Sequence, residues 1–277
     1  MVARVCEGER ERQDLGYSVR PMLPTATPSD PLRPHPLLKE FYGSEGERRR
    51  RIVGWFDESA LDYDWVNRVL SLGTGSRYRR EALLRAGLAA GMSALDVACG
   101  TGVLAAHAQE IAGPMGLAVG LDPSAGMLRQ AGARGVRRRV IGVAEALPFP
   151  DGRFDVLSMG YALRHVADLR ATFREYRRVL QPGGRVLILE ITPPESRLRH
   201  RFLAFYMGRI LPFLARLGRR GRTSRLLMRY FWETIATCVP PPVILGALEE
   251  AGFHGVERRV QMGFLSEYTA VAPHPRG

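Results

Sequence analysis

Between residues 92 and 195, short apolar runs alternate with segments in which apolar residues recur every three or four positions. The short runs are SALDVA, LAVGLD, RRVIGVA, FDVLSMG and RVLILEI, and each has the length of a buried strand. Helical spacing lies between them at about 103–112, 124–133 and 168–180. This alternation predicts an α/β fold in which helices cover both faces of a mostly parallel sheet.

The flanking segments have patterns of their own. Prolines and scattered charges dominate the first residues and favour a disordered tail. Helical spacing precedes the first strand, and a further helix and two weak strands, HGVERRVQ and GFLSEYTAV, follow near the end and bring the predicted sheet to seven strands. We therefore predict a tail over 1–40, a helical lid over 41–91, a ligand-binding core over 92–195, an Arg-rich helical insertion over 196–236, and a helix with strands over 237–277.

The formal net charge of +12 is concentrated in the insertion. Residues 196–230 contain ten arginines and no acidic residue. Apolar residues recur at helical spacing over 197–220, which predicts an amphipathic helix with a kink near Pro212. Three interpretations stay open: a lid on the domain, a surface that contacts an anionic membrane, and a nucleic-acid site, which no recognisable RNA-binding module supports.

Three cysteines, at positions 6, 99 and 238, lie far apart and have no metal-ligand spacing. We expect no disulfide framework and no metal. The first residues lack the apolar stretch of a signal peptide, and no apolar run reaches the length of a membrane span. These features favour a cytoplasmic protein.

The stretch ALDVACGTGVL, residues 94–104, ends an apolar strand in a glycine turn. Such a turn lets backbone amides and a helix N-terminus approach a ligand closely. It also fits the G-x-G-x-x-A pattern of nicotinamide enzymes, with Asp122 as the ribose-binding acid. Asp96, however, places a carboxylate under the turn, where it can hold the loop or accept a hydrogen bond from a bound ammonium through water. A pyrophosphate gains nothing from that charge, which favours S-adenosylmethionine.

Several longer stretches resemble one family. LDVACGTG, GLDPSAGML, AEALPFPDGRFDVLSMGYALRHVADL, REYRRVLQPGGRVLILEITPP and LEEAGF are similar to successive motifs of the ubiquinone/menaquinone-biosynthesis C-methyltransferases. The resemblance covers about residues 50–255. It implies a Rossmann-like class I methyltransferase fold, S-adenosylmethionine as the methyl donor with S-adenosylhomocysteine as product, and a metal-independent reaction.

The resemblance also implies a cofactor site. The glycine turn would lie along the methionine moiety, Asp122 would bind the ribose hydroxyls, Ala144 would offer its amide to adenine, and Met127 would pack on the adenine face. The alternatives are a plain tight turn, a helix N-cap for Asp122 and a core role for Met127. The predicted cofactor residues are Asp96, Gly100, Thr101, Gly102, Asp122, Met127, Val143, Ala144 and Gly160.

The chain departs from the family at three of its positions. Val143 stands where Asn or Asp usually contacts adenine, Gly160 where Ser is common, and His165 where Asn is common. The C-terminal GFLSEYTAV also differs from the family's glycine-rich ending. These departures concern the acceptor pocket more than the cofactor.

Carbon methylation of a phenol requires loss of the hydroxyl proton, so a base or an oxyanion stabiliser should face the methyl group. The resemblance assigns Arg164 to activating a water or stabilising the phenolate. His165 is a candidate base, with a helix-entry or solvent role as the alternative. The family places Tyr63 beside the cofactor, and simple lid packing is its alternative.

We therefore expect a methyltransferase that acts on a carbon of a quinone-like or phenolic acceptor, which the resemblance allows to be polyprenylated. Methylation of oxygen or nitrogen, a nicotinamide oxidoreductase and a non-catalytic cofactor-binding protein remain open. So do peripheral contact with the inner face of the membrane through 196–230 and a homo-oligomer.

Overall fold

The computed structural model describes residues 30–70, 75–194, 196–206, 209 and 221–274. The chain divides into two units, Met1–Asp30 and Pro31–Gly277, and every described helix and strand belongs to the second. Residues 1–29, which make up most of the predicted tail, lie outside the described residues, as does the predicted kink near Pro212.

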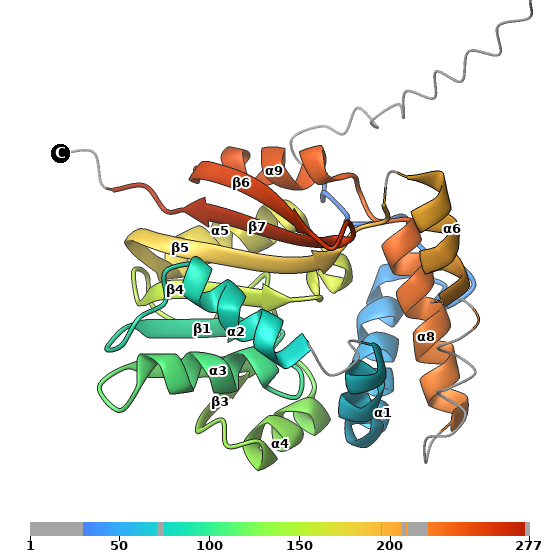
Figure 1. The fold of residues 1–277 in the computed structure, drawn as a ribbon, viewed down its shortest axis with the longest axis horizontal. Coiled ribbons are helices and arrows are strands. Elements are labelled where there is room, and N and C mark those ends of the chain that lie inside the picture. Colours follow the sequence, from blue (N-terminus) through green and yellow to red (C-terminus); the bar gives the residue numbers. More distant parts are fainter. Residues whose placement is uncertain (1–29, 71–74, 195, 207–208, 210–220, 275–277) are drawn as a thin grey trace, which may run out of the picture. The chain divides into compact units, whose positions relative to one another are not determined.

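One seven-stranded sheet forms the centre of the second unit, as the sequence pattern predicts (Figure 1). The strand order is β3-β2-β1-β4-β5-β7-β6, and β7 runs in the direction opposite to the other six strands. The strands are β1 (Ser93–Val97), β2 (Leu117–Asp122), β3 (Arg138–Ile141), β4 (Phe154–Gly160), β5 (Leu180–Ile191), β6 (His254–Gln261) and β7 (Leu265–Val271).

Alternating side chains give the sheet two apolar faces. In β1, Leu95 and Val97 join the larger cluster on one face, whereas Ala94 joins the smaller cluster on the other. Helices α5 (Leu169–Val179) and α9 (Pro241–Glu250) pack on the first face, and α2 (Gly75–Arg85) and α3 (Val103–Ala112) pack on the second (Figure 1). Helix α4 (Ala125–Ala133) packs beside α3. The predicted helices thus cover both faces.

A separate, aromatic-rich cluster holds three further helices together at one end of the sheet. They are α1 (Glu45–Leu70), α6 (Arg197–Phe205) and α8 (Gly221–Ala236), which we call the helical cover (Figure 1). The buried residues of this cluster are Phe41 and Tyr42, which precede α1, and Ile52, Leu203, Tyr230, Phe231 and Ile235 from the three helices.

The prediction of a tail up to residue 40 is wrong for its last part. Leu37 and Leu38 pack against the aromatic cluster, and His35 is buried beside Arg48 of α1. The prolines make this segment extended, but its apolar side chains still find a core to bury against.

The chain runs outward from β1 through β2 to β3 and then crosses to β4 on the other side of β1, so the strand order reverses at β1. In open α/β sheets, ligands bind in the crevice outside the carboxyl ends of the strands at such a point. The loops that follow β1, β2 and β4 should therefore form the site.

Candidate active site

The turn after β1 has an unusual backbone. Ala98, Gly100 and Gly102 all have positive φ, at 53°, 56° and 80°. The Gly100 amide donates a 2.8 Å hydrogen bond to Asp122, and a side chain at Gly100 would point into open space. Because Gly100 presents only backbone there, the turn leaves room for a ligand close to the main chain.

Gly102 has a packing reason to be glycine. A Cβ atom at this position would lie 2.8 Å from both Ala131 Cβ and Val136 Cγ2. Gly102 therefore allows the start of α3 to approach α4, and it is not among the residues that line the cavity described below.

Asp96 is a buried carboxylate with one unsatisfied oxygen. Its side chain lies at the end of β1, and Oδ1 accepts a 2.7 Å hydrogen bond from Ser158. The Oδ2 atom is buried and has no hydrogen-bond partner among the described residues. Burial raises the pKa of Asp96 to about 7. A bound cationic group would satisfy this oxygen and favour its ionised form.

Asp122, at the end of β2, organises the neighbouring loops. Its oxygens accept 2.8 Å hydrogen bonds from the amides of Gly100 and Ser124. The alternative of an N-cap role is wrong, because Ser124 is the N-cap of α4 and its hydroxyl accepts from the Met127 amide at 3.0 Å. Burial raises the pKa of Asp122 to about 6. Each carboxylate oxygen keeps further acceptor capacity for a ligand hydroxyl.

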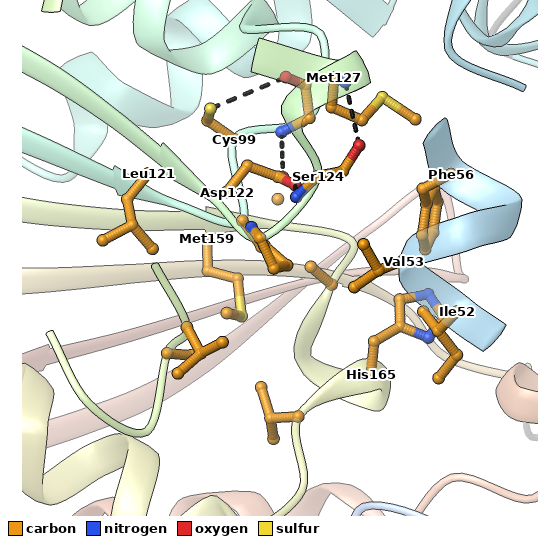
Figure 2. A pocket seen from close by; sticks show the side chains of 18 of the residues that line it. Ile52, Val53, Phe56, Cys99, Leu121, Asp122, Ser124, Met127, Met159 and His165 are labelled. Atoms are coloured by element: carbon orange, nitrogen blue, oxygen red, sulfur yellow. Dashed lines mark hydrogen bonds between the residues drawn. The ribbon is translucent and has the colours of Figure 1, made fainter. Parts of the chain in front are cut away.

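A cavity of about 550 Å³ lies at the carboxyl ends of β1, β2 and β4. Its volume falls in the usual range for cofactor pockets. One part, the polar end, is lined by Asp96, Cys99, Gly100, Thr101, Asp122 and Ser124. Another part, the apolar end, is lined by Ile52, Val53, Phe56 and His165, which Figure 2 shows together. Ala162 and Val166, close to His165 in the chain, also line the cavity.

Helix α1 closes the cavity from above the strand ends. It contributes the apolar Ile52, Val53 and Phe56 to the lining, and also Gly46, Arg48 and Arg49. Farther along the helix, Asp57 accepts hydrogen bonds from the Ser124 hydroxyl and from the Gly126 amide, the latter at 2.7 Å. The absence of a side chain at Gly126 permits this approach, since a Cβ there would lie 2.8 Å from Asp57 Oδ1. The helical cover is thereby tied to α4.

Arg79 of α2 also lines the cavity, a residue that the sequence interpretation missed. Its guanidinium lies over the ring of Tyr161, 4.8 Å from the ring centroid. Tyr161 follows β4 with a positive φ of 61°, which is uncommon for a large side chain and typical of functional loops. Arg79 is one of four arginines in SRYRREALLR, and no sequence pattern distinguishes it from the other three.

Arg164 is placed behind the cavity wall. It lies in the 3₁₀ turn η1 (Leu163–His165), is 3% exposed, and pairs with buried Glu190 of β5 at 2.9 Å. It also donates to the Tyr161 carbonyl at 2.7 Å, while Glu190 accepts from the Leu163 amide at 2.8 Å. It is not among the lining residues, so this ion pair fixes η1 on the sheet.

His165 does line the cavity, at its apolar end. Figure 2 shows its ring beside Ile52 and near Phe56 of α1, away from Asp122 and Ser124. Its Nδ1 lies 3.2 Å from the hydroxyl of Tyr230 in α8. Burial, reinforced by Arg164, Arg48 and His35, lowers the pKa of His165 well below its usual value.

The cavity thus gathers most of the residues singled out from the sequence. Lining it are Asp96, Gly100, Thr101, Asp122, Met127, Val143, Ala144, Gly160 and His165. The side chain of Tyr63 lies outside the described residues. Gly160 has a local reason to be glycine, because a Cβ would lie 2.6 Å from Leu104 Cδ1. The functional assignments of these residues remain predictions.

The part of the chain that the structure describes holds no group of three or more His, Cys, Asp or Glu side chains arranged to bind a metal ion. A metal-independent reaction stays a prediction from the sequence.

Known proteins resemble this chain both in sequence and in fold. The sequence model of the ubiE/COQ5 methyltransferase family matches residues 44–270. The ubiquinone/menaquinone biosynthesis C-methyltransferase UbiE of Cellvibrio japonicus is 32% identical over 235 residues, which cover 82% of this chain and 93% of that protein. The protein of that name from Geobacter sulfurreducens is 39% identical over 178 residues, which cover 62% of this chain and 70% of that protein.

Solved structures support the fold. A Thermotoga maritima protein, described as an S-adenosylmethionine-dependent methyltransferase and possible histamine N-methyltransferase, aligns over 79% of this chain and 98% of its own, with a TM-score of 0.56 and 18% identity. At that identity the likeness establishes the class I methyltransferase fold alone. The family match, however, runs from α1 to β7 and includes every strand around the cavity. The protein therefore belongs to the ubiE/COQ5 methyltransferase family and is an S-adenosylmethionine-dependent methyltransferase.

Proposed function

We propose that this enzyme methylates a ring carbon of a phenolic or quinol-type acceptor. The observation that carries the proposal is a single cavity in which a polar end, with an unsatisfied buried carboxylate oxygen, adjoins an apolar, aromatic end. The first suits the charged methionine part of the cofactor, and the second suits an aromatic ring. The relatives named as ubiquinone/menaquinone biosynthesis C-methyltransferases support a quinone-like acceptor.

The residues at the polar end fit S-adenosylmethionine. We assign the cofactor's ammonium to Asp96, whose Oδ2 has no partner among the described residues. We assign its carboxylate to Arg79, the cation that lines the cavity from α2. Asp122 would bind the ribose hydroxyls, and Met127 and Val143 would pack around adenine, with the Ala144 amide as the polar contact. When bound, the cofactor supplies an electrophilic methyl group on its sulfonium.

At the apolar end, Ile52, Val53 and Phe56 would pack on the acceptor ring and hold it against the methyl-donor site. The acceptor must lose its hydroxyl proton as its ring carbon becomes nucleophilic, which places a polar group beside that oxygen. His165 is one of the polar side chains that line the cavity near these apolar residues, together with Arg48 and Arg49 of α1. The Arg164–Glu190 pair would hold η1, and therefore His165, in place.

The test is methyl transfer by the purified protein from isotope-labelled S-adenosylmethionine to a prenylated quinol that lacks one ring methyl. We expect product heavier by one methylene, with the label on a ring carbon in fragment spectra. Label on oxygen, or transfer only to unrelated amines, would instead support the O- or N-methyltransferase alternative. Cofactor binding without turnover on any acceptor would indicate a non-catalytic binder and overturn the proposal.

We also propose that the protein is cytoplasmic and contacts the inner face of an anionic membrane through 196–230. On α6, Leu198 and Phe205 are 79% and 53% exposed, and Arg197 and Arg201 beside them are exposed too. No single described helix has the length and apolar character to span a bilayer; the segments Arg229–Ala236 and Pro241–Glu250, bent by 74°, meet that test only together. An exposed apolar face flanked by arginines suits an anionic lipid surface.

Vesicle sedimentation tests this contact. The protein should bind vesicles that contain phosphatidylserine, and binding should weaken as salt rises because the charges are screened. Replacing Arg197, Arg199, Arg201 and Arg209 with Gln should reduce binding without lowering the thermal midpoint. If the wild type ignores these vesicles at every salt concentration, the insertion is only a lid.

A further inference from the structure

Aromatic rings from the helical cover fix the plane of the His165 imidazole. Tyr230 of α8 stacks on it with ring centroids 5.4 Å apart and an angle of 21° between the planes. Phe56 of α1 meets it edge-on at 5.6 Å, and Phe231 lies at 5.9 Å. A ring enclosed in this way cannot turn freely, so its two nitrogens keep fixed directions.

The two nitrogens of His165 have different surroundings. Nδ1 lies 3.2 Å from the Tyr230 hydroxyl, within hydrogen-bond distance. Nε2 is buried and has no hydrogen-bond partner among the described residues, although the side chain lines the cavity. A buried polar atom without a partner is uncommon and commonly marks a site where a ligand completes the network.

The polarity of the Tyr230 hydrogen bond decides the tautomer of the imidazole. In a neutral imidazole one nitrogen carries the proton and the other accepts. A phenolic hydroxyl is a stronger donor than an imidazole N–H, and an imidazole nitrogen is a stronger acceptor than a phenolic oxygen. The favoured arrangement therefore has the Tyr230 hydroxyl donating to Nδ1, with the imidazole proton on Nε2.

Charges around His165 oppose its protonation. Arg164 faces it from η1, Arg48 from α1 and His35 from the segment before α1, and these groups add to the effect of burial in lowering its pKa. A phenol has a pKa of about 10, well above the lowered pKa of this imidazole. His165 is therefore a poor acceptor for the substrate's proton.

We propose that His165 acts as a hydrogen-bond donor to the acceptor oxygen, and that Tyr230 is the positioning residue that sets its tautomer. This inference rests on the proposed function, since the oxygen belongs to the phenolic acceptor. The hydroxyl proton passes to water, and the Nε2–H group stabilises the negative charge left on oxygen. The ring carbon then takes the methyl group from the sulfonium, and the electron pair of the broken C–S bond stays on sulfur, which gives S-adenosylhomocysteine. Loss of the hydrogen on that carbon as a proton to water restores the aromatic ring. Tyr230 is not among the residues that line the cavity and acts through His165.

The tautomer can be measured without any substrate. Protein labelled with ¹⁵N-histidine should show, for His165, a protonated Nε2 and an unprotonated Nδ1 at every pH from 6 to 8. His165→Asn identifies the signals by their loss. Tyr230→Phe, which keeps the stacked ring, should shift the two nitrogens toward a mixture of tautomers. A proton on Nδ1 in the wild type, or titration near pH 6.5, would overturn the inference whether or not the protein methylates a quinol.

Kinetic measurements with the prenylated quinol distinguish hydrogen-bond donation by His165 from a role of His165 and Tyr230 in packing alone. His165→Asn should keep turnover within about tenfold of the wild type, because an amide donates a hydrogen bond but does not accept a proton at neutral pH. His165→Ala should lose about 100-fold, with the KM for the cofactor unchanged. Tyr230→Phe should lower kcat about tenfold in the wild type and not further in His165→Asn. If Tyr230→Phe lowers kcat equally in the wild type and in His165→Asn, Tyr230 contributes only packing. If His165→Asn is as inactive as His165→Ala, His165 acts as a base.

Discussion

The polar and apolar ends of the cavity are built in different ways. At the polar end, Gly100 is hydrogen-bonded to Asp122, and both belong to consecutive strand–turn–helix units. At the apolar end, His165 contacts Tyr230, 65 positions away, and the buried Arg48 of α1 donates to the Val166 carbonyl, 118 positions away. The polar end therefore follows from the sheet, whereas the apolar end exists only after the helical cover has packed.

This difference predicts which property a substitution at each end of the cavity should change. Changes at the polar end should alter cofactor affinity and leave the fold intact, because its contacts are to backbone groups of rigid strand ends. Changes at the apolar end should affect folding or turnover, because its side chains join distant elements. The following substitutions test that separation.

The largest effect is expected for Arg164→Ala. This variant leaves Glu190 buried without its ionic partner, and the loss of unfolding free energy should be about 3–5 kcal/mol. Denaturant titration measures it. The double variant Arg164→Met with Glu190→Gln, which removes both charges, should lose less. If Arg164→Ala instead keeps full stability but loses turnover, Arg164 acts on the substrate directly.

Asp122→Ala should weaken S-adenosylhomocysteine binding at least tenfold, about 1.4 kcal/mol, because the carboxylate would accept the ribose hydroxyls. Calorimetry on the folded variant measures the affinity. Asp151→Ala, which removes an exposed carboxylate paired with Arg178, is the matched control and should bind normally. Unchanged affinity in Asp122→Ala would remove the ribose assignment and leave only the loop contacts.

Asp96 should make cofactor binding dependent on pH. Its pKa of about 7 means that the neutral acid predominates below that pH, whereas the cofactor's ammonium favours the carboxylate. Affinity for S-adenosylhomocysteine should therefore rise by several-fold between pH 6 and pH 8. In Asp96→Asn this increase in affinity should disappear. If the variant shows an increase of the same size, another titrating group causes the pH dependence.

The same shift has the opposite consequence for stability. The pKa of Asp96 is higher in the folded protein than its ordinary value of 3.8, so the folded form holds the proton more tightly and ionisation destabilises it as pH increases from about 4 to 7. Asp96→Asn should raise the thermal midpoint of the cofactor-free protein at pH 8 more than at pH 5. An equal change at both values would contradict the shift.

The smallest effect concerns Asp57, which connects the two ends. Asp57→Ala removes the hydrogen bonds from Ser124 and Gly126 that tie α1 to α4. We expect a two- to fivefold loss in cofactor affinity, about 0.5–1 kcal/mol, because the cover closes less firmly. Glu249→Ala, an exposed carboxylate on α9, is the control. A loss of thermal stability without a change in affinity would limit Asp57 to structural support.

Much of the polar end could be predicted from the sequence. The run SALDVA predicts β1, LAVGLD coincides with β2, and the glycine turn between them identifies Asp96, Gly100 and Asp122 as cavity residues. These features depend on contacts between neighbours in the chain and on the period of buried positions, both of which are written in local sequence. The mostly parallel sheet follows from the alternation of strands and helices, whereas the order of the strands comes from the structure.

Other features were decided only by tertiary structure. The sequence places Arg164 and His165 in one turn, but packing makes the first a buried partner of Glu190 and places the second beside Tyr230, where burial lowers its pKa. Likewise, nothing local distinguishes Arg79 from the arginines around it, and the proline-rich start of the second unit gives no sign that Leu37 reaches a core. The physical reason is that burial and charge compensation depend on contacts between residues that are distant in the sequence. The local pattern of residues along the chain does not specify those contacts.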